Sequence, residues 1–276
     1  MNGEVAVIIL NYNTWQRTLE TVEMLHQVLK VASDDIYVID NASSNDSYQQ
    51  LQNCQSHSYQ LLRAETNAGY AAGNNIGLRY VREQGYHYAW ILNNDIVIKD
   101  RKLLRKMISV LKTDKNLAVV NPDIYAPDGH LFNRESKRPT FFDYTFGMFH
   151  YRKLGRQLKN RGGYGYVYRP QGCCMLLDLE KAKEAGDLDE RTFLYGEEVI
   201  LAERLLRKGY LCACCPGISV LHNHSTTVKN VYTRKRVIQM KLESFRYYLR
   251  EYRHYSGFKT EVTTWFYRIK LYLLEL

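Results

Sequence analysis

The sequence predicts an α/β fold with a mostly parallel sheet and helices on both of its faces. Three apolar runs of strand length, residues 5–10, 36–39 and 89–92, are separated by segments with helical periodicity. Apolar runs without polar alternation are typical of strands that are buried on both faces. Strands that alternate with helices in this rhythm favour right-handed crossovers and therefore parallel pairing.

The expected elements follow one another in a regular order. The first strand precedes a helix whose apolar positions recur at steps of three and four: Trp15, Leu19, Val22, His26 and Leu29. After the second strand, another helix begins in the polar cluster 43–47, and a third unit spans residues 67–92. A helix then follows Asp95, and residues 172–222 add a strand, two helices and a last strand.

Two segments stand outside this order, and they hold the excess positive charge. Residues 126–171 contain nine Lys and Arg against three Asp and Glu, and residues 229–276 contain eleven against four, in a chain of net charge +9. We expect the first, aromatic and glycine-containing, to be a loop or lid insertion, and the second to be a basic C-terminal helical extension. Localised charge favours an anionic partner, either a phosphate-bearing substrate, an anionic lipid surface or nucleic acid. A charged surface that serves only solubility is the alternative.

The cysteines and the apolar runs bear on the compartment. The six cysteines lack the spacing of a zinc site, and those at 173–174 and 212–215 lie in apolar strand-like runs, which favours buried thiols in a reducing cytosol. No apolar run reaches 18 residues, and no basic segment precedes the short run 5–10 as in a signal peptide. We therefore expect a cytoplasmic location.

Polar side chains follow each of the first strands. Asn11, Tyr12 and Asn13 follow the first strand, and Asp40 and Asn41 follow the second. In a doubly wound sheet these loops are adjacent and can hold one nucleoside, with an aromatic ring on the base and a carboxylate on an imide N–H or a ribose hydroxyl. No G-x-G-x-x-G follows the first strand and no P-loop motif occurs, so the sequence disfavours dinucleotide and P-loop sites.

Two further segments indicate a diphosphate and a metal ion. The polar helix start at Asn67, Gly69 and Asn74 would let the backbone approach a diphosphate, although glycine there also permits tight packing. A strand ends at Asn93, Asn94 and Asp95, and a carboxylate beside amide oxygens suits Mg²⁺ or Mn²⁺. An ordinary turn rich in Asn and Asp is the alternative reading of the second segment.

Glu197, Glu198 and His222 complete the candidate residues. The two glutamates begin a helix directly after an aromatic run and a glycine, where an aromatic wall would raise a carboxyl pKa toward that of a general base. Helix-start glutamates also simply stabilise the helix dipole. His222, followed by His224, ends the last strand and is either a metal ligand beside carboxylates or a structural side chain.

The order of these segments resembles that of glycosyltransferase family 2, the GT-A fold enzymes, and within it the bacterial rhamnosyltransferase-like branch of surface polysaccharide synthesis. The resemblance covers residues 4–228, so we expect a transferase domain over 1–228 with a Rossmann-like sheet. It rests on these segments: NYN after the first strand, VIDNASSND, NAGYAAGNN, WILNNDIVI, the stretch 172–210 and LHNHS.

The resemblance implies a role for each candidate residue. The family's D-x-D metal motif falls on Asn93 to Asp95, with asparagine in place of the first acid. Nucleoside contact falls on Asp40 and the loop 11–13. The base is the second residue of an acidic pair, which is Glu198 here in place of the usual aspartate, supported by Glu197. A histidine after the last strand completes the metal site, which implies His222.

The expected reaction is an inverting, metal-dependent transfer of a hexose or deoxyhexose. The donor would be a UDP- or dTDP-sugar, and the acceptor a glycan or polyprenyl-linked hydroxyl. The alternatives are a non-catalytic sugar-nucleotide or glycan binder and a sugar nucleotidyltransferase, which would need a glycine-rich, basic loop after the first strand. Nucleic acid is not expected as a partner, because no RRM, KH or helix-turn-helix signature is present.

The C-terminal extension has two interpretations. Aromatic and apolar residues from 265 to 274 beside Arg268 and Lys270 are typical of an interfacial helix, which would dock the enzyme on the inner face of the cell membrane. A helix packed on the domain, or a contact between two copies, is the alternative. The oligomeric state is left open.

Overall fold

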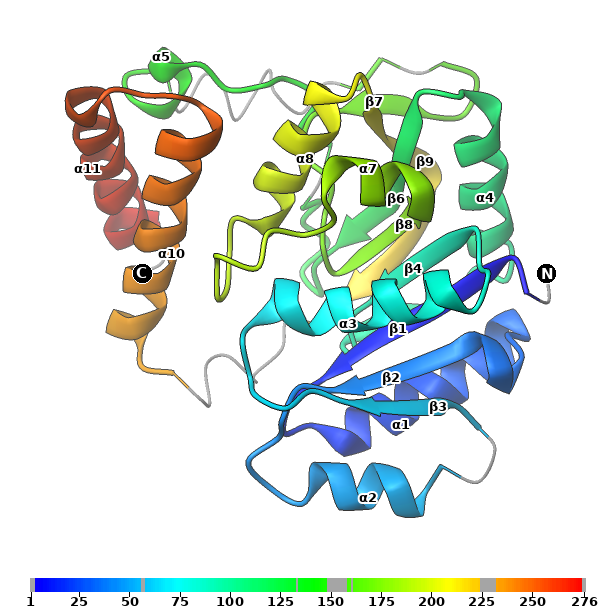
Figure 1. The fold of residues 1–276 in the computed structure, drawn as a ribbon. Helices are drawn as coiled ribbons and strands as arrows, with labels where there is room; N and C mark the ends of the chain where they lie inside the picture. The colour runs from blue at the N-terminus through cyan, green and yellow to red at the C-terminus, as the bar shows by residue number, and fades with distance from the viewer. Residues whose placement is uncertain are drawn as a thin grey trace.

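The computed structural model describes residues 3–55, 58–132, 134–147, 158–159, 161–223 and 232–274. Within them the chain forms a nine-stranded sheet in the order β3-β2-β1-β4-β8-β6-β9-β5, and β7 pairs with β9 (Figure 1). The strands are β1 Val5–Asn11, β2 Ile36–Asp40, β3 Gln60–Arg63, β4 Tyr88–Leu92, β5 Ile96–Ile98, β6 Leu117–Tyr125, β7 Gly165–Val167, β8 Cys174–Asp178 and β9 Leu211–His222. The helices are α1 Trp15–Met24, η1 Leu25–Leu29, η2 Ser33–Asp35, α2 Ser47–Asn53, α3 Tyr70–Glu83, α4 Leu103–Thr113, α5 Phe141–Tyr144, α7 Leu179–Ala185, α8 Glu197–Arg207, α10 Arg234–Tyr247, η3 Tyr248–Tyr252 and α11 Gly257–Leu274.

Helices cover both faces of the sheet because the parallel strands are apolar at successive positions. Val7 and Ile9 of β1 share one core with α1 and α4, and Ile8 shares the other with α3, α7 and α8. Neighbouring side chains of a strand point to opposite faces, so an unbroken apolar run needs a covering layer on each side. The predicted α/β class with helices on both faces is confirmed.

The two halves of the sheet differ in strand direction. β3, β2, β1 and β4 are parallel, as predicted. β8 is antiparallel to both of its neighbours, and β5 is antiparallel to β9, so the second half is mixed. Parallel pairing needs a crossover that returns the chain to the starting edge. Between β6 and β8 the chain instead passes through the insertion 126–171, and only a short turn joins β4 to β5.

The insertion 126–171 contains regular structure where it is described. β7 pairs with β9, and Arg138 donates hydrogen bonds of 2.8 and 2.6 Å to the buried carboxylate of Glu203 on α8. Both contacts attach this part of the insertion to the sheet and to α8. Residues 133, 148–157 and 160 lie outside the described residues, so the lid stays a prediction.

The cysteines and the helices can be compared directly with the expectations from the sequence. All six cysteines are free thiols, and Cys174, Cys212, Cys214 and Cys215 are buried, as the apolar context predicts. Burial raises the pKa of Cys212 to about 12, so this thiol stays protonated. Among the described helices, none is long and apolar enough to cross a bilayer.

The C-terminal helices pack against α8. Tyr248, Leu249 and Tyr252 of η3 are buried in a cluster with Ile200 of α8, and α11 lies on the far side of α10 (Figure 1). α10 and η3 confirm the helical pattern predicted for residues 232–255. Of the two interpretations of this region, packing on the domain therefore holds for α10 and η3.

A buried carboxylate fastens η3 to the rest of the chain. Asp189, which is 2% exposed, accepts hydrogen bonds from the hydroxyls of Tyr247 at 2.7 Å and Tyr252 at 2.5 Å. Burial alone raises the pKa of the Asp189 carboxyl. Hydrogen bonds from Arg191, Tyr252 and Tyr247 outweigh burial and hold that pKa well below its usual range. The ionised carboxylate therefore joins η3 to the loop before α8.

One glycine joins the start of α3 to the segment before α8. Gly69 has φ +100°, and a Cβ added to it would lie 2.1 Å from the carbonyl oxygen of Phe193. The same oxygen accepts a hydrogen bond of 2.9 Å from the backbone N–H of Tyr70. Only glycine allows two backbones to approach this closely in that conformation. Tight packing, the alternative reading of Gly69, is what the structure shows.

This contact predicts a large penalty for Gly69→Ala. The added Cβ brings backbone strain and steric overlap of about 1–3 kcal/mol each, so the free energy of unfolding should fall by roughly 2–6 kcal/mol. Urea unfolding followed by circular dichroism measures it.

Gly85→Ala is the matched control. Gly85 has φ +86°, and an added Cβ would meet no atom within 4 Å, so this variant carries backbone strain without overlap. Gly69→Ala should cost at least about 1 kcal/mol more than Gly85→Ala. Equal costs would show that the approach to Phe193 is unimportant.

Candidate functional site

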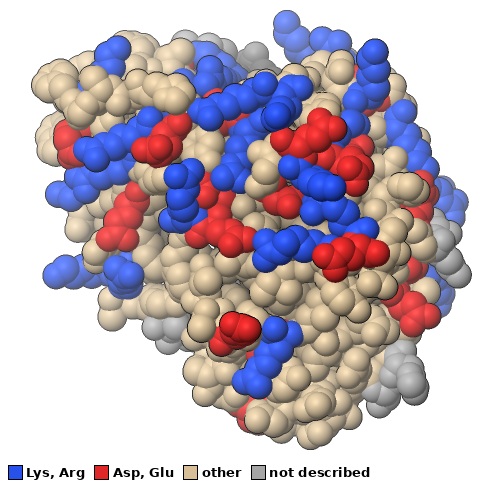
Figure 2. Space-filling view, viewed as in Figure 1, with Lys and Arg blue, Asp and Glu red and all other residues tan. Residues whose placement is uncertain are grey.

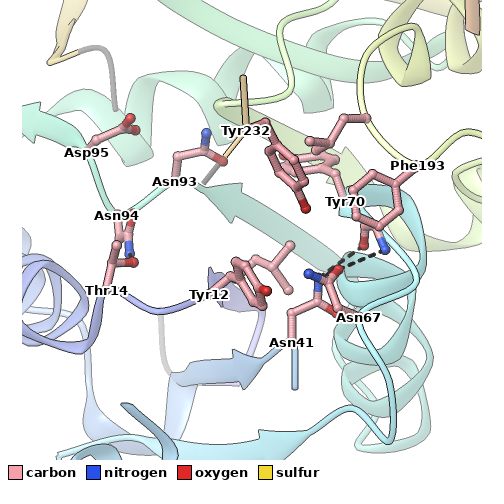
Figure 3. Close-up of a pocket in the computed structure, with 13 residues that line it drawn as sticks. Tyr12, Thr14, Asn41, Asn67, Tyr70, Asn93, Asn94, Asp95, Phe193 and Tyr232 are labelled. Atoms are coloured by element: carbon pink, nitrogen blue, oxygen red, sulfur yellow. Dashed lines mark hydrogen bonds between the residues drawn. The ribbon is translucent and has the colours of Figure 1, made fainter. Parts of the chain in front are cut away.

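A cavity of about 140 Å³ opens where the loops after β1, β2 and β4 meet (Figure 3). The carboxyl ends of parallel strands share one edge of a sheet, so their loops converge there. Phe193 and Leu194 before α8, and Tyr232 before α10, close the other side. The lining comprises Leu10, Tyr12, Thr14, Asn41, Asn67, Gly69, Tyr70, Asn93, Asn94, Asp95, Phe193, Leu194 and Tyr232.

Seven residues singled out in the sequence line this cavity together. They come from four segments far apart in the chain: Tyr12, Asn41, Asn67, Gly69, Asn93, Asn94 and Asp95. Asn41 joins its own segment to the one that holds Asn67 and Gly69. Its Nδ2 donates to the side-chain oxygen of Asn67 at 3.0 Å and to the carbonyl of Gly69 at 3.2 Å (Figure 3). The loop after β2 therefore fixes the start of α3.

Asn11 and Asp40 lie behind the cavity rather than in its lining. Both are 0% exposed, and Asn11 Nδ2 donates to an Asp40 oxygen at 2.9 Å. Ser43 donates to the same carboxylate through its hydroxyl at 2.6 Å and its backbone N–H at 3.0 Å. In this arrangement Asp40 shapes the turn after β2 and joins it to the end of β1.

Asn13 and Asn74 also serve the loops in which they lie. Asn13 has φ +60°, and its side-chain oxygen accepts from the backbone N–H of Ser44 at 2.8 Å. Asn74 is fully buried, and its Nδ2 donates to the carbonyl of Tyr70 at 2.9 Å. Neither side chain is part of the lining.

Asp95 and His222 lie next to each other because of strand register. Ile96 of β5 pairs with His222 of β9, which brings His222 Nε2 to 3.2 Å from Asp95 Oδ1. Asp95 is only 6% exposed, and within the described residues neither of its carboxylate oxygens accepts a hydrogen bond. A buried carboxylate without hydrogen-bond donors is costly unless a cation compensates it.

This pair fits a divalent cation that takes its other ligands from a substrate. A carboxylate and an imidazole suit Mn²⁺, and Mg²⁺ commonly binds through one or two carboxylates together with phosphate oxygens. Among the described residues, no group of three or more His, Cys, Asp or Glu side chains could hold a metal alone. His224 lies outside the described residues.

The neighbouring asparagines of this segment differ in their contacts. The backbone N–H of Asn93 donates to the carbonyl of Cys173 at 2.9 Å, which fixes the turn against the residue before β8. The Nδ2 of Asn94 donates to the hydroxyls of Thr14 and Thr18, both at 2.9 Å. Asn94 therefore joins the turn after β4 to α1.

Glu197 and Glu198 begin α8 in different environments. Glu197 is 8% exposed, and within the described residues its Oε2 has no hydrogen-bond partner. Burial, and then the charge of Glu198, raise the pKa of Glu197 well above its usual range. Glu198 is half-buried, and its Oε1 lies 3.4 Å from the backbone nitrogen of Gly172.

Tyr70 connects the acidic pair to the cavity. It lines the cavity, and its hydroxyl donates to the carbonyl of Gly172 at 2.8 Å, beside Glu198. Burial raises the pKa of the Tyr70 phenol well above its ordinary value, and the charges of Glu197, Glu198 and Asp95 raise it further. All three carboxyl groups therefore lie within electrostatic reach of one phenol, although neither glutamate is part of the lining.

Sequence reasoning did not single out the other six lining residues, and three of them are aromatic: Tyr70, Phe193 and Tyr232. Tyr70 follows Gly69 in a segment whose glycine and asparagines alone were taken as candidates. Phe193 belongs to the aromatic run before the acidic pair, which is the signal that could have identified it. Tyr232 precedes α10, and its ring lies 6.2 Å from the ring of Phe193. The basic extension thus contributes an aromatic wall to the cavity.

Comparisons with known sequences agree on one family. Residues 6–184, which are 179 of the 276, match the profile of glycosyl transferase family 2. The low-salt glycan biosynthesis hexosyltransferase Agl10 of Haloferax volcanii is 26% identical over 230 residues, 81% of this chain and 68% of that protein. An N-acetylglucosaminyl-diphospho-decaprenol L-rhamnosyltransferase of Mycobacterium tuberculosis is 40% identical over 57 residues, 20% of this chain and 19% of that protein.

Solved structures with the same fold are all distant in sequence. The mannosyltransferase PcManGT of Pyrobaculum calidifontis, in complex with GDP-Man and Mn²⁺, has a TM-score of 0.60 at 14% identity and covers 98% of this chain and 70% of that one. GalNAc-T7 with UDP, GalNAc and Mn²⁺ has a TM-score of 0.60 at 15% identity, over 80% of this chain and 44% of that one. Together with the family profile, these folds show that the chain belongs to glycosyl transferase family 2 and is a glycosyltransferase with the GT-A fold.

Proposed function

We propose that the chain transfers a hexose or deoxyhexose from a UDP- or dTDP-sugar to a hydroxyl of a glycan or polyprenyl-linked acceptor, with inversion. The observation that carries this proposal is the buried carboxylate of Asp95, which accepts no hydrogen bond within the described residues, lies beside His222 and lines a cavity at the carboxyl edge of the sheet. A diphosphate and its cation supply the positive charge and the oxygens that such a site lacks.

The relatives support the choice of donor and acceptor. The mycobacterial relative is named for L-rhamnosyl transfer to a decaprenyl diphosphate-linked sugar, and the archaeal relative for hexosyl transfer in glycan synthesis. Solved neighbours hold UDP or GDP-Man, two of them with Mn²⁺. A lipid-linked acceptor would place the enzyme on the inner face of the cell membrane. Residues 1–228 would form the transferase domain, and the extension 229–276 would complete its cavity through Tyr232.

The lining supports a division of the cavity among the parts of the donor. Tyr12 offers its ring to the base, and Asn41 and Asn67 offer amide groups near the ribose. Asp95 and His222 would hold Mg²⁺ or Mn²⁺, which when bound neutralises the charge that develops on the departing diphosphate. Asn11, Asp40 and Asn13 act from behind, because their hydrogen bonds fix the loops that carry Tyr12 and Asn41.

The environments of the two glutamates favour Glu198 as the general base. Two adjacent carboxyl groups resist simultaneous ionisation, and the deeply buried Glu197 is the one that stays protonated. Glu198 is better solvated and can take the proton from the acceptor hydroxyl as it attacks the anomeric carbon. The Tyr70 phenol lies within electrostatic reach of this pair and of Asp95, and its hydrogen bond to the Gly172 carbonyl would hold the base side of the site against the cavity.

A non-catalytic sugar-nucleotide binder is the second candidate. It is favoured by Asn93, an amide in the cavity lining at the position where the family usually has an acid. Calorimetric titration of UDP- and dTDP-sugars with Mn²⁺, combined with a hydrolysis assay, separates the two. An enzyme shows slow metal-dependent hydrolysis of the sugar it binds, whereas a binder shows affinity without turnover.

Removal of the cation should abolish activity. EDTA should stop transfer and added Mn²⁺ or Mg²⁺ restore it, and Asp95→Ala should lower turnover on the order of 10²-fold or more. Mn²⁺ binding in the presence of UDP should be lost in the same variant, measured by calorimetry. Asp128→Ala, in an exposed turn, is the control. Full activity in excess EDTA would contradict the metal requirement.

The acidic pair should respond unequally to neutralisation. Glu198→Gln keeps the shape but removes the proton acceptor, so turnover should fall roughly 10²–10⁴-fold with donor affinity nearly unchanged. Glu197→Gln should cost less, because an amide resembles the protonated carboxyl that burial favours there. Turnover and donor affinity of both variants are measured at one pH and metal concentration. The reverse order of activities would move the base to Glu197.

A further inference from the structure

The outer helix α11 buries three threonines and exposes aromatic side chains, although Leu271 near its C-terminal end is buried. Thr260, Thr263 and Thr264 are 0%, 0% and 1% exposed, and they face the rest of the protein. On the opposite face Phe258 is 80% exposed and Trp265 is 56% exposed. A surface helix in water normally buries its apolar stripe and exposes its polar one. The exposed stripe of α11 is therefore the feature that needs a partner.

Thr263 and Thr264 have their hydroxyls satisfied within the helix, and the Thr260 hydroxyl donates to the carbonyl of Tyr255, just before the helix, at 3.4 Å. Thr263 donates to the carbonyl of Lys259 and Thr264 to that of Thr260, both at 2.7 Å. No other element has to supply hydrogen bonds to this face. The helix can therefore keep its aromatic side chains outward without leaving buried polar groups unpaired.

The apolar stripe continues onto α5 and forms one aromatic surface. We define the aromatic surface by its exposed members, which are Phe142, Phe146, Phe258, Trp265, Tyr272 and Leu273. Phe146 contacts Phe266 of α11 with ring centroids 5.1 Å apart, and Phe266 contacts Trp265 at the same distance. α5 and α11 thus present their rings together, although more than 100 residues separate them in the chain.

Basic residues surround the aromatic surface, and its acid is paired. Glu261 is the one acidic residue in the described length of α11, and Arg246 and Arg250 lie 2.8 and 3.8 Å from its carboxylate. Lys259 and Arg268 are exposed on α11 itself. Residues other than Lys, Arg, Asp and Glu gather at the upper left of the molecule, where α5 and α11 lie, with both basic and acidic side chains among and below them (Figure 2).

We propose that the aromatic surface docks on an anionic lipid bilayer, with the rings at the headgroup level and the surrounding cations on lipid phosphates. Aromatic rings with basic neighbours on one helix face are typical of interfacial binding. A second copy of the chain would bring the same cations face to face, which disfavours self-association here. This proposal rests on the aromatic surface alone. If the proposed function also holds, docking would bring a lipid-linked acceptor within reach of the enzyme.

Vesicle co-sedimentation of the full chain tests the proposal. Binding to vesicles of phosphatidylglycerol and phosphatidylcholine should exceed binding to phosphatidylcholine alone and should weaken at high salt. Phe258→Ser with Trp265→Ser should lower partitioning by about tenfold or more, because two apolar side chains leave the lipid. Tyr80→Ser is the matched control, since Tyr80 is 36% exposed on α3, away from α5 and α11.

Fluorescence gives an independent readout. The chain has three tryptophans; Trp90 is 0% exposed and Trp265 is the exposed one among those that the structure describes. Anionic vesicles should therefore shift the Trp265 emission to the blue. Equal binding to both kinds of vesicle, or binding that survives the double substitution, would overturn the proposal. So would a dimer in lipid-free sedimentation that the substitution dissociates. Donor hydrolysis should be unchanged in the double variant, which separates this test from that of the proposed function.

Discussion

The approach of Gly69 to the Phe193 carbonyl is the constraint on which the site depends. It joins the start of α3, held by Asn41 from the loop after β2, to the segment that leads into Glu197 and Glu198. Without it, the loops after β1 and β2 and the acidic pair would belong to separate parts of the molecule. The same segment carries Phe193, whose ring lies 6.2 Å from the ring of Tyr232, so the C-terminal extension meets the cavity beside this contact.

Strand register supplies the second constraint. The antiparallel pairing of β5 with β9 brings His222 to Asp95 across more than 120 residues of chain, in a part of the sheet where the parallel rhythm has ended. Within the described residues the Asp95 carboxylate accepts no hydrogen bond, and the stability of the surrounding sheet offsets the free-energy cost of burying it. A binding site commonly keeps such a destabilised group, because the ligand then supplies the missing interaction.

The sequence predicts the strands and their polar ends well, because apolar runs and Asn- or Asp-rich loops are local signals. It predicts less about which side chains face the ligand. Asp40 ends β2 as expected, yet Ser43 turns back and occupies its carboxylate, and that depends on a turn conformation that the pattern does not encode. Tyr232 reaches the cavity only because η3 docks on α8 through Asp189, a long-range contact. The sequence also did not predict that α11 buries its threonines and exposes Phe258 and Trp265, because helical periodicity does not show which stripe is buried.

The most direct test of the donor site is a crystal structure of the chain with UDP and Mn²⁺. The uracil and ribose should lie between Tyr12, Asn41 and Asn67, and the metal should lie within about 2.1–2.3 Å of the Asp95 carboxylate and the diphosphate. His222 should provide a further ligand through its imidazole. A metal placed away from Asp95, or a nucleotide bound outside the cavity between Tyr12 and Phe193, would contradict the proposed site.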